Sequence, residues 1–460
     1  MKKFKMPSIL VYALPMIIVF SIVMLAYWPG ILSPDAMVQW NQVQTGEIDN
    51  WHPAYSTIYI FLLTRICNSP AFVIIIQYIL IAFIFAYTLT RIEKYYKVNK
   101  LVLFFVSCLF ALTPLNFNFA VNMLKDVLYS FWILLLIAFL IDIINDKEWL
   151  KKWYHCLLLF MAGLLVSLFR HNGIIVIGIM ALVLILIYRK EKSIYFVCIG
   201  WIAAYLLMTS VGFKILNIKE ANYSNKYGPV SHILAKMLNN DKVEFTEEDI
   251  ENMSEFVDVE ELKNTYKLYN MDYSIRAQKV EALKENGTEY LKIGLHKAIQ
   301  YPLEVVKYYI KTTSFFYSPI PFPESYVAGM FTETELYIYE NVYPELKENS
   351  KLPTLVKELK NIENKWQTGT LGIITMRPAI YMYLSIIAII VLIKKYKDKK
   401  ILLLILPSLL NMLSLAPAMP VPSTRYVYIT MLTFWVVVPW CIYKIYSDYN
   451  HKEEKVETES

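Results

Sequence analysis

Residues 122–144 read NMLKDVLYSFWILLLIAFLIDII, so a pair of charged residues stands directly before a long apolar run. The run, residues 127–144, approaches the roughly 20 apolar residues with which a helix crosses a bilayer. Ionisable groups at membrane depth are costly, so those beside the end of a span are candidates for function. This stretch predicts a membrane-spanning helix that starts with Lys125 and Asp126, either as functional groups or simply as each other's partners.

Similar apolar runs are spread along the whole chain. They occupy residues 7–28, 71–90, 101–119, 156–169, 173–188, 194–213, 371–393, 401–416 and 427–446. The run at 156–169 is short, and a run at 55–66 is shorter still, so we expect the latter at the membrane interface. The pattern predicts an all-α fold, namely a polytopic transmembrane helical bundle of about ten spans.

The composition agrees with a lipid environment. Hydrophobic residues make up 57% of the 460 residues and charged residues 18%, with a mean hydropathy of +0.40. Soluble proteins have about 45–50% apolar and about 25% charged residues. An ordinary cytosolic enzyme, a disordered chain and a disulfide-stapled secreted domain are therefore excluded, and the five scattered cysteines predict neither a disulfide framework nor a metal site.

The distribution of Lys and Arg predicts the orientation of the bundle, because cytoplasmic loops carry an excess of basic residues. With the N-terminus inside, cytoplasmic segments hold 21 Lys and Arg residues and short external segments hold 4. We therefore expect a multi-pass protein of the cell membrane with both termini cytoplasmic. Its expected parts are a seven-span module at 1–213 with a first external loop at 29–70, an external domain at 214–370, a three-span module at 371–446 and a cytoplasmic tail at 447–460.

The external domain is predicted to be mainly helical. It holds 19 Lys and Arg residues against 24 Asp and Glu residues. Thr246 and Asp249 have the spacing of a capping box, which predicts a helix that continues to about residue 269. Pro302 suits the first turn of a second helix, expected at 303–317, whose aromatic end is suited to the membrane interface.

Asp35 stands in the first external loop, within the sequence Ser33-Pro34-Asp35. A Ser hydroxyl followed by Pro is a favourable helix start, so we expect a helix to begin at about residue 35. A carboxylate in its first turn, close to the bilayer surface, is suited to accept a proton from a substrate hydroxyl. Capping of the same helix is the alternative role.

Two further polar clusters lie at the external ends of predicted spans. Arg170, His171 and Asn172 separate two apolar runs with almost no loop, and Arg170 suits planar, bidentate recognition of phosphate. Arg425, next to Tyr426, is the only charge in the loop before the last span, where its alternative role is to snorkel to the interface. With the charges described above, these clusters gather cations and carboxylates at one interface, as an anionic, membrane-borne substrate would require.

The first external loop also carries aromatic residues and residue types that bind metals. Trp40 and Trp51 could stack on a sugar ring, or act as the aromatic residues that are common at membrane interfaces. Glu47, Asp49 and His52 lie close together, but their spacing is not that of a defined metal site. A divalent cation held by these three residues is the alternative, but we expect no metal and no other cofactor.

A resemblance to a known superfamily is carried by Asp35, His52, Pro53, Lys125, Asp126, Arg425 and Tyr426. The chain resembles the GT-C polytopic glycosyltransferases, in particular the RgtA/B/C/D-like and protein-mannosyltransferase-like membrane proteins, and within these an uncharacterised bacterial subgroup. The likeness covers the first seven predicted spans. Many members carry two adjacent acidic residues in the first loop, whereas Asp35 stands between Pro34 and Ala36, which argues against a metal-bridging mechanism.

The resemblance implies transfer of a sugar from a polyprenyl-phosphate donor to a cell-envelope glycan, lipid or protein on the outer face of the membrane. Asp35 would be the general base of an inverting reaction, and Asp126 would position the acceptor or support the base. Lys125, Arg170 and Arg425 would neutralise the donor phosphate as charge develops. The expected substrate-binding residues are His52, Trp40, Trp51, His171, Asn172 and Tyr426.

Other functions remain as alternatives. A transporter or flippase of lipid-linked saccharides often shows internal repeats and broken spans, whereas this sequence has no evident repeat and its charges gather at span ends. A polymerase or ligase of lipid-linked oligosaccharides shares the substrate class and the large external loop. A scaffolding membrane protein is a third alternative, while nucleic-acid binding lacks the single basic patch that it requires.

Overall fold

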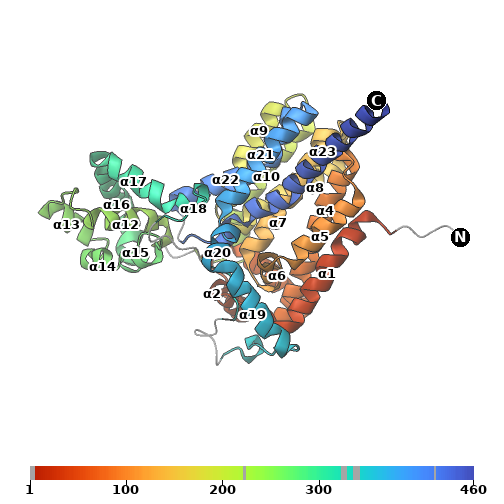
Figure 1. The fold of residues 1–460 in the computed structure, drawn as a ribbon. Coiled ribbons are helices and arrows are strands. Elements are labelled where there is room, and N and C mark those ends of the chain that lie inside the picture. The colour runs from red at the N-terminus through yellow and green to blue at the C-terminus, as the bar shows by residue number, and fades with distance from the viewer. Residues whose placement is uncertain (1–5, 221–223, 323–328, 335–341, 419–420, 460) are drawn as a thin grey trace.

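The computed structural model describes residues 6–220, 224–322, 329–334, 342–418 and 421–459 (Figure 1). These residues form α-helices linked by short turns and 3-10 segments, and none of them belongs to a β-strand. The all-α fold expected from the sequence is therefore observed. The basic residues at positions 2, 3 and 5, which contributed to the orientation rule, lie outside the described residues.

Six described helical segments are long and apolar enough to cross a membrane, which is compatible with a multi-pass membrane protein. They are α1 (Ser8–Ala26), α4 (Pro70–Tyr96), α7 (Lys125–Asn145), α10 with its continuation (Lys192–Ile215), α21 (Pro378–Tyr396) and residues Thr424–Asn450, which include most of α23 (Tyr428–Glu459). Shorter apolar helices are α3 (Ala54–Ile66), α8 (Trp153–Phe169), α9 (Gly173–Ile187) and the segment Leu406–Ala418, which contains α22 (Leu406–Leu415). The count of ten spans is not confirmed, because several expected spans are these shorter helices.

Prolines interrupt two of the expected spans. The run at 101–119 forms α5 (Lys100–Leu112) and α6 (Pro114–Val121), which are bent by 67° relative to each other. The run at 371–393 is divided between α20 (Gly369–Thr375) and α21, with Arg377 in an extended conformation before Pro378. Both breaks have the same cause, because the residue before a proline is disfavoured in the α-helical conformation.

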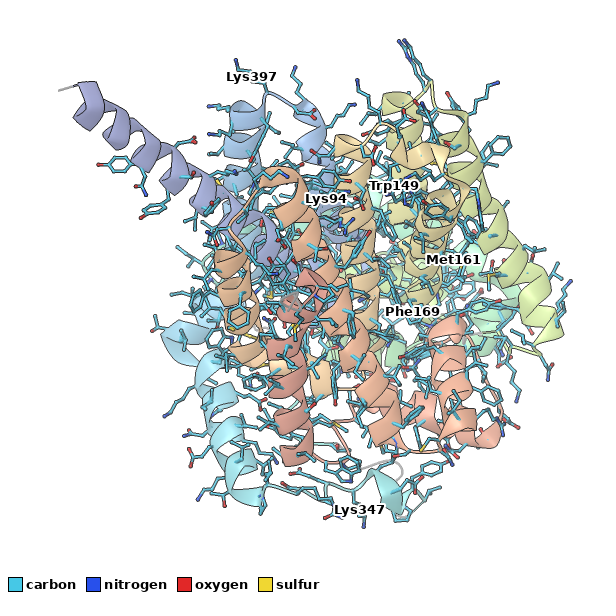
Figure 2. The ribbon with its side chains drawn as sticks, turned by 90° about the vertical axis from the view of Figure 1, so that its right-hand side faces the viewer. Lys94, Trp149, Met161, Phe169, Lys347 and Lys397 are labelled. Atoms are coloured by element: carbon cyan, nitrogen blue, oxygen red, sulfur yellow. The ribbon has the colours of Figure 1, made fainter. Side chains whose placement is uncertain are left out.

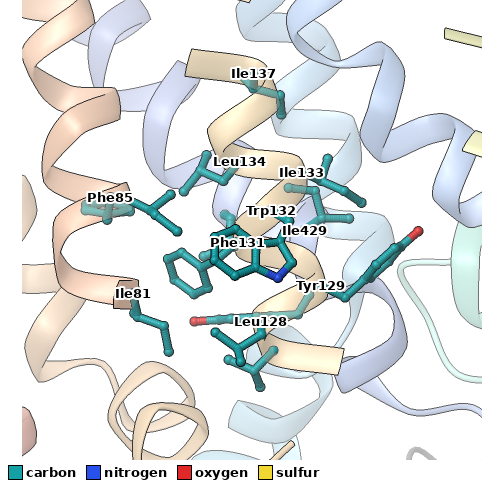
Figure 3. Close-up of a cluster of buried hydrophobic side chains, with 14 of the residues drawn as sticks. Ile81, Phe85, Leu128, Tyr129, Phe131, Trp132, Ile133, Leu134, Ile137 and Ile429 are labelled. Atoms are coloured by element: carbon teal, nitrogen blue, oxygen red, sulfur yellow. The ribbon is translucent and has the colours of Figure 1, made fainter. Parts of the chain in front are cut away.

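Helix α7 forms the centre of the bundle and is almost completely enclosed. It packs against α4, α8 and α23, and 89% of its most apolar 18-residue stretch is buried. Figure 3 shows the surrounding core, in which Ile81 and Phe85 of α4 lie on the side of α7 that carries Phe131 and Leu134. Ile429 of α23 lies near Ile133 of α7. A helix that is hydrophobic on all sides is buried in a protein interior or in a membrane, and α7 is surrounded by other helices, which agrees with its lack of a polar face.

The loops expected on one side of the membrane lie towards one end of the bundle. Lys94 in the last turn of α4, Trp149 after α7 and Lys397 after α21 lie in the upper part of Figure 2, and Lys347 lies at the opposite end. The first end carries the loops expected in the cytoplasm, and the second carries segments expected outside.

The region expected as one external domain consists of two parts. Residues 224–318 form a helical domain that projects from the side of the bundle (Figure 1), with its own core around Leu234, Phe256 and Tyr290. In contrast, α19 (Pro353–Gln367) packs against α1 and α6. The buried Glu363 of α19 accepts hydrogen bonds from the Tyr27 hydroxyl at 2.6 Å and from the Asn118 amide at 3.0 Å. The second part therefore belongs to the bundle.

The local helix signals in this region are only partly correct. The capping box between Thr246 and Asp249 is confirmed, but its helix, α13 (Glu247–Ser254), ends well before residue 269. Pro302 begins α17 (Pro302–Thr312) as expected, and the chain then turns at Thr313 before the short α18 (Ser314–Tyr317). In the region expected as a cytoplasmic tail, α23 continues as a helix to Glu459.

A buried histidine makes the helical domain sensitive to acid. His232 lies between a hydrogen bond with the Tyr308 hydroxyl at 2.7 Å and one with the Lys267 carbonyl at 3.0 Å. The carbonyl can only accept, so Nε2 carries the proton and Nδ1 accepts from Tyr308. Burial lowers the pKa of His232 to about 4, so the neutral ring is the folded form at neutral pH.

We expect the helical domain to lose stability as the pH falls from about 6.5 towards 4. In that window the unfolded chain binds a proton at His232 that the folded domain excludes, which favours unfolding. Thermal unfolding of the full-length protein in detergent at pH 7 and pH 5 measures the effect. The His232→Gln variant should show a smaller difference between the two pH values than the matched variant His296→Gln, whose side chain is exposed. Equal pH sensitivity of the two variants would contradict this role of His232.

Candidate functional site

A cavity of about 450 Å³ opens where the helical domain meets the bundle. Ligand pockets commonly have volumes of about 300–1,000 Å³. Its walls come from the first loop, the start of α7, the turn between α8 and α9, the end of α22, the loop before α23, and the helical domain. The residues that line it are Asp35, Trp51, His52, Pro53, Lys125, Asp126, Arg170, His171, Asn172, Met271, Asp272, Ser414, Leu415, Ala418, Arg425 and Tyr426.

The chain places Asp35 at this cavity through a helix start and a short backbone pairing. Asp35 is in the first turn of α2 (Pro34–Thr45), and the Ser33 hydroxyl accepts a hydrogen bond from the Ala36 amide. Just before this helix, the Ile31 amide donates to the Val121 carbonyl at 3.0 Å and the Ile31 carbonyl accepts from the Met123 amide at 2.9 Å. This pairing holds the start of α2 beside the start of α7.

Gly30 makes that close approach feasible. Its φ of 112° lies in a region that other residues rarely adopt, and a Cβ atom there would lie 2.1 Å from the Ile74 side chain. A residue with a side chain would be strained in this backbone conformation, so glycine is favoured at this position.

The charged residues at the base of the cavity form one connected network. Lys125 Nζ lies 2.7 Å from Asp35 Oδ2, and Arg170 Nη1 lies 2.5 Å from Asp126 Oδ1. Arg425 links the two pairs, with Nη1 3.4 Å from Asp35 and Nε 3.7 Å from Asp126. Five residues that are far apart in the sequence thus meet in one site, which contains three cations and two carboxylates.

A tight turn directs Arg170 into this network. The Gly173 amide donates to the Arg170 carbonyl at 2.9 Å, and a Cβ atom on Gly173 would lie 2.0 Å from the Val166 carbonyl oxygen. Because glycine permits such close packing, α9 starts immediately after α8 ends, and the polar side chains between them face the site. The Tyr426 ring lies against both arginines, 4.7 Å from the Arg170 guanidinium and 4.9 Å from that of Arg425, which favours the charged, planar groups in these positions.

The network determines the protonation of its neighbours. Partial burial alone would raise the pKa of the Asp35 carboxyl, but Lys125 and Arg425 outweigh it and hold that pKa well below its usual value. Burial, assisted by Lys125, lowers the pKa of His52 to about 3. At neutral pH, Asp35 is therefore a carboxylate and His52 is neutral, so His52 adds a hydrogen-bonding group and no charge.

The structure distributes the other sequence-predicted site residues unevenly. Trp51, His52 and His171 line the cavity, and a His171 ring nitrogen lies 3.2 Å from the Trp51 carbonyl oxygen. Asn172 also lies there, but its amide donates to Asn411 at 3.0 Å and to Ser414 at 2.8 Å. These hydrogen bonds hold α22 against the turn between α8 and α9.

Trp40 requires a correction. We expected it to be available for stacking on a sugar, but its side chain is completely buried in the core and does not line the cavity. Because α2 is amphipathic, Asp35 and Trp40 lie on different faces of the same helix, and Trp40 packs inward. Trp51 is the tryptophan that reaches the cavity.

One acidic residue at the cavity was missed by the sequence reasoning. Asp272, at the start of α15 (Asp272–Arg276), comes from the helical domain and lies at the mouth of the cavity. Its carboxylate makes no ion pair with any residue in the described part of the chain. Desolvation raises the pKa of this carboxyl, and the Asp35 carboxylate adds to the effect. No local motif marks Asp272, because only the docking of the helical domain brings it here.

The residues considered for a metal site serve other purposes. Glu47 pairs with Lys219 at the surface, 2.9 Å apart, and the Asp49 carboxylate accepts a hydrogen bond from the Trp51 amide. Within the described ranges, no group of three His, Cys, Asp or Glu side chains is arranged to hold a metal ion.

The fold and the cavity define the chain as an all-helical protein with the long apolar helices of a multi-pass membrane protein and a charged site at one end of its bundle. It belongs to the Family of unknown function (DUF6020), whose model matches residues 67–457. Of the five residues in the charged network, Asp35 lies before that range. The other four lie within it, namely Lys125, Asp126, Arg170 and Arg425. No curated protein and no solved structure matches the chain significantly.

Proposed function

We propose that the protein is an integral-membrane glycosyltransferase, which transfers a sugar from a polyprenyl-phosphate donor to a cell-envelope acceptor outside the membrane. The observation that carries the proposal is the network of Asp35, Lys125, Asp126, Arg170 and Arg425 around a cavity of about 450 Å³. The three cations exceed the two carboxylates by one positive charge. A sugar–phosphate–prenyl diester carries a single negative charge, so its phosphate would neutralise this excess.

The same three cations can stabilise the negative charge that develops on the leaving group during the reaction. The bond from the anomeric carbon to a phosphate oxygen breaks, and the acceptor oxygen forms the new bond to that carbon from the opposite face. The leaving polyprenyl phosphate becomes a monoester and gains negative charge. Lys125, Arg170 and Arg425 are fixed before the reaction starts, so they can stabilise this growing charge without reorganisation.

Asp35 is proposed as the base that takes the proton from the acceptor hydroxyl. In its pairs with Lys125 and Arg425 the carboxylate is a weak base, because both cations stabilise its charged form. A donor phosphate would compete for the same two cations, which weakens their hold on Asp35 and raises its basicity. The donor would thereby activate the base that the acceptor needs.

Asp126 is better placed to hold cations than to contact an acceptor. Its side chain is fully buried and contacts Arg170 and Arg425. We therefore propose that Asp126 is a positioning residue, which orients both guanidinium groups towards the phosphate. This refines the role that the family likeness suggested for it.

The proposal includes a GT-C-like bundle of about ten spans, with both termini cytoplasmic and the cavity at the outer face. The short apolar helices α8 and α9, of 17 and 15 residues, support the higher span count, because they pack against each other and are joined by a short turn, as two successive short spans would be. In this orientation the cavity lies at the membrane surface, where the donor phosphate would also lie.

The function is tested by comparing the cell-envelope glycans of cells with and without the protein. A missing sugar residue on an otherwise intact glycan, lipid or protein supports transfer of a single sugar. A change in chain length with unchanged composition would instead support polymerisation or ligation of lipid-linked oligosaccharides. Loss of a whole glycan together with accumulation of its lipid-linked saccharide on the cytoplasmic side would favour a flippase.

Asp272 is expected to bind the acceptor rather than the donor, because it lies at the mouth of the cavity and repels a phosphate. Replacing Asp272 by Asn should raise the KM for the acceptor roughly 10-fold, the effect of losing one charge-assisted hydrogen bond. The KM for the donor should be unchanged or lower. Steady-state transfer in proteoliposomes measures both constants. An unchanged acceptor KM would remove Asp272 from the binding site, and Glu285→Gln, on an exposed face of the same domain, is the matched control.

A further inference from the structure

The helical domain exposes an unusual row of apolar side chains. On α16 (Val280–Gln300) and α17 the exposed apolar residues are Leu291, Leu295, Ile299, Leu303, Val306 and Ile310, which we call the apolar ridge. Ile299 and Leu303 are 70% and 72% exposed. A contiguous exposed row of this kind usually marks an interaction surface.

The ridge is not the inner face of these helices. The buried side of α17 carries Tyr308, and the buried side of α16 includes Leu283 and Tyr290. On α17, Leu303, Val306 and Ile310 lie at positions i, i+3 and i+7, directly opposite Tyr308. Helix α17 therefore has two apolar sides, and the outer one has no partner among the described residues.

The ridge continues into the apolar surface of the bundle. After α17 the chain returns to the bundle through α18, where the Tyr383 hydroxyl of α21 donates to the Tyr317 carbonyl at 2.7 Å. Tyr317 and Ile320 extend the exposed apolar surface from the ridge to Tyr383 and Ile387 on the outside of α21. Figure 1 shows α17 on the side of the domain from which the bundle helices α21 and α9 extend.

The part of the domain that carries the ridge also differs in charge from the rest of the domain. Residues 244–289 of the domain hold 13 Asp and Glu residues against 5 Lys and Arg residues. Residues 290–322, which include the whole ridge, hold 4 Lys residues against 1 acidic residue, and one of the four, Lys297, is buried and pairs with Asp249. Lys307 and Lys311 flank the ridge on α17 and are exposed; Lys307 also pairs with Glu304 at 2.5 Å. This side of an otherwise acidic domain therefore carries exposed cations that suit an anionic surface.

We infer that the apolar ridge is a membrane-contact surface, which rests in the headgroup region of an anionic bilayer beside the bundle. Apolar side chains on one helix face with lysines beside them are typical of helices that lie in the plane of the interface. The contact would hold the helical domain over the bundle and keep Met271 and Asp272 at the mouth of the cavity. The inference requires that the bundle lies in a membrane, and it holds whether or not the cavity transfers a sugar.

The test places a fluorophore on the ridge of the full-length protein. The five cysteines are replaced, and a single cysteine at Leu303, at Val306 or at the control position Glu285 is labelled with a polarity-sensitive dye. Each protein is reconstituted into vesicles of phosphatidylethanolamine and phosphatidylglycerol, with and without a lipid that carries a spin label near its headgroup. Normal detergent-gel filtration of each variant shows that it is folded.

Labels at Leu303 and Val306 should emit at shorter wavelength than the label at Glu285 and be quenched roughly twofold by the spin-labelled lipid, since interfacial helices sink about 5–10 Å into the headgroup region. Water-like emission at both ridge positions would overturn the inference. Blue-shifted emission without quenching by lipid would also overturn it, because a protein partner or a second copy would then cover the ridge.

Discussion

Replacing Asp35 by Asn is expected to lower the rate of sugar transfer by about 100-fold to 10,000-fold, the contribution typical of a general base. The amide keeps the shape of the side chain and cannot take the proton from the acceptor hydroxyl. Because the change also removes a negative charge from beside Lys125 and Arg425, donor binding should be unchanged or tighter. Steady-state kinetics in proteoliposomes should therefore show a large fall in kcat with no rise in the KM for the donor.

The matched control for this experiment is Glu47→Gln. Glu47 lies in the same first loop, but its carboxylate pairs with Lys219 at the surface and does not line the cavity. Transfer by this variant should equal that of the unmodified protein. If Asp35→Asn kept full activity while Glu47→Gln behaved normally, the carboxylate of Asp35 would have no part in proton transfer.

The second large effect is expected on stability and does not depend on the proposed reaction. Replacing Asp126 by Ala leaves Arg170 and Arg425 close together, almost buried and without the carboxylate between them. Removing one partner of a buried ion pair typically costs about 3–5 kcal/mol. Thermal unfolding in detergent should therefore begin at a clearly lower temperature for Asp126→Ala.

Two further variants separate this effect from a general loss of stability. Glu148→Ala breaks an exposed ion pair with Lys151 and should leave the unfolding temperature unchanged. The double variant Asp126→Ala/Arg170→Ala should recover part of the loss, because it also removes one of the uncompensated charges. An unfolding temperature of Asp126→Ala equal to that of Glu148→Ala would show that the network does not stabilise the bundle.

Local signals in the sequence predicted the helices well and their breaks poorly. The apolar run at 127–144 lies within α7, and the sequence around Ser33 begins α2 as expected, because both depend on residues that are near each other in the chain. The bend before α6 and the break before α21 were missed, although Pro114 and Pro378 mark both. The hydrophobicity of a long apolar run predicts one continuous helix. The residue before a proline is disfavoured in the helical conformation, however, and this breaks the helix.

For the site, the sequence predicted the residue types and could not predict how they meet. Asp35, Lys125, Asp126, Arg170 and Arg425 were candidates because each is charged and stands at the end of an apolar run. Their network depends on the pairing of Ile31 with the chain before α7 and on the turn at Gly173, which are contacts between distant segments or matters of backbone geometry.

The two errors at the site have related causes. Trp40 was expected at the cavity, but the face of α2 that it occupies is set by packing against the rest of the bundle. Asp272 was not considered, because an acidic residue in an acidic domain carries no local signal. Only the position of the helical domain against the bundle brings Asp272 to the mouth of the cavity.

The central claim is that the charged cavity breaks the bond between a sugar and a polyprenyl phosphate. The most direct measurement incubates the purified protein in liposomes with polyprenyl-phosphate-linked hexoses or pentoses, labelled in the sugar, and with an extract of envelope acceptors. We predict that the label moves to the acceptor and that free polyprenyl phosphate appears in equal amount, while Asp35→Asn leaves the donor intact. A donor that is unchanged by the unmodified protein, or that crosses the bilayer with its sugar still attached, would contradict the claim.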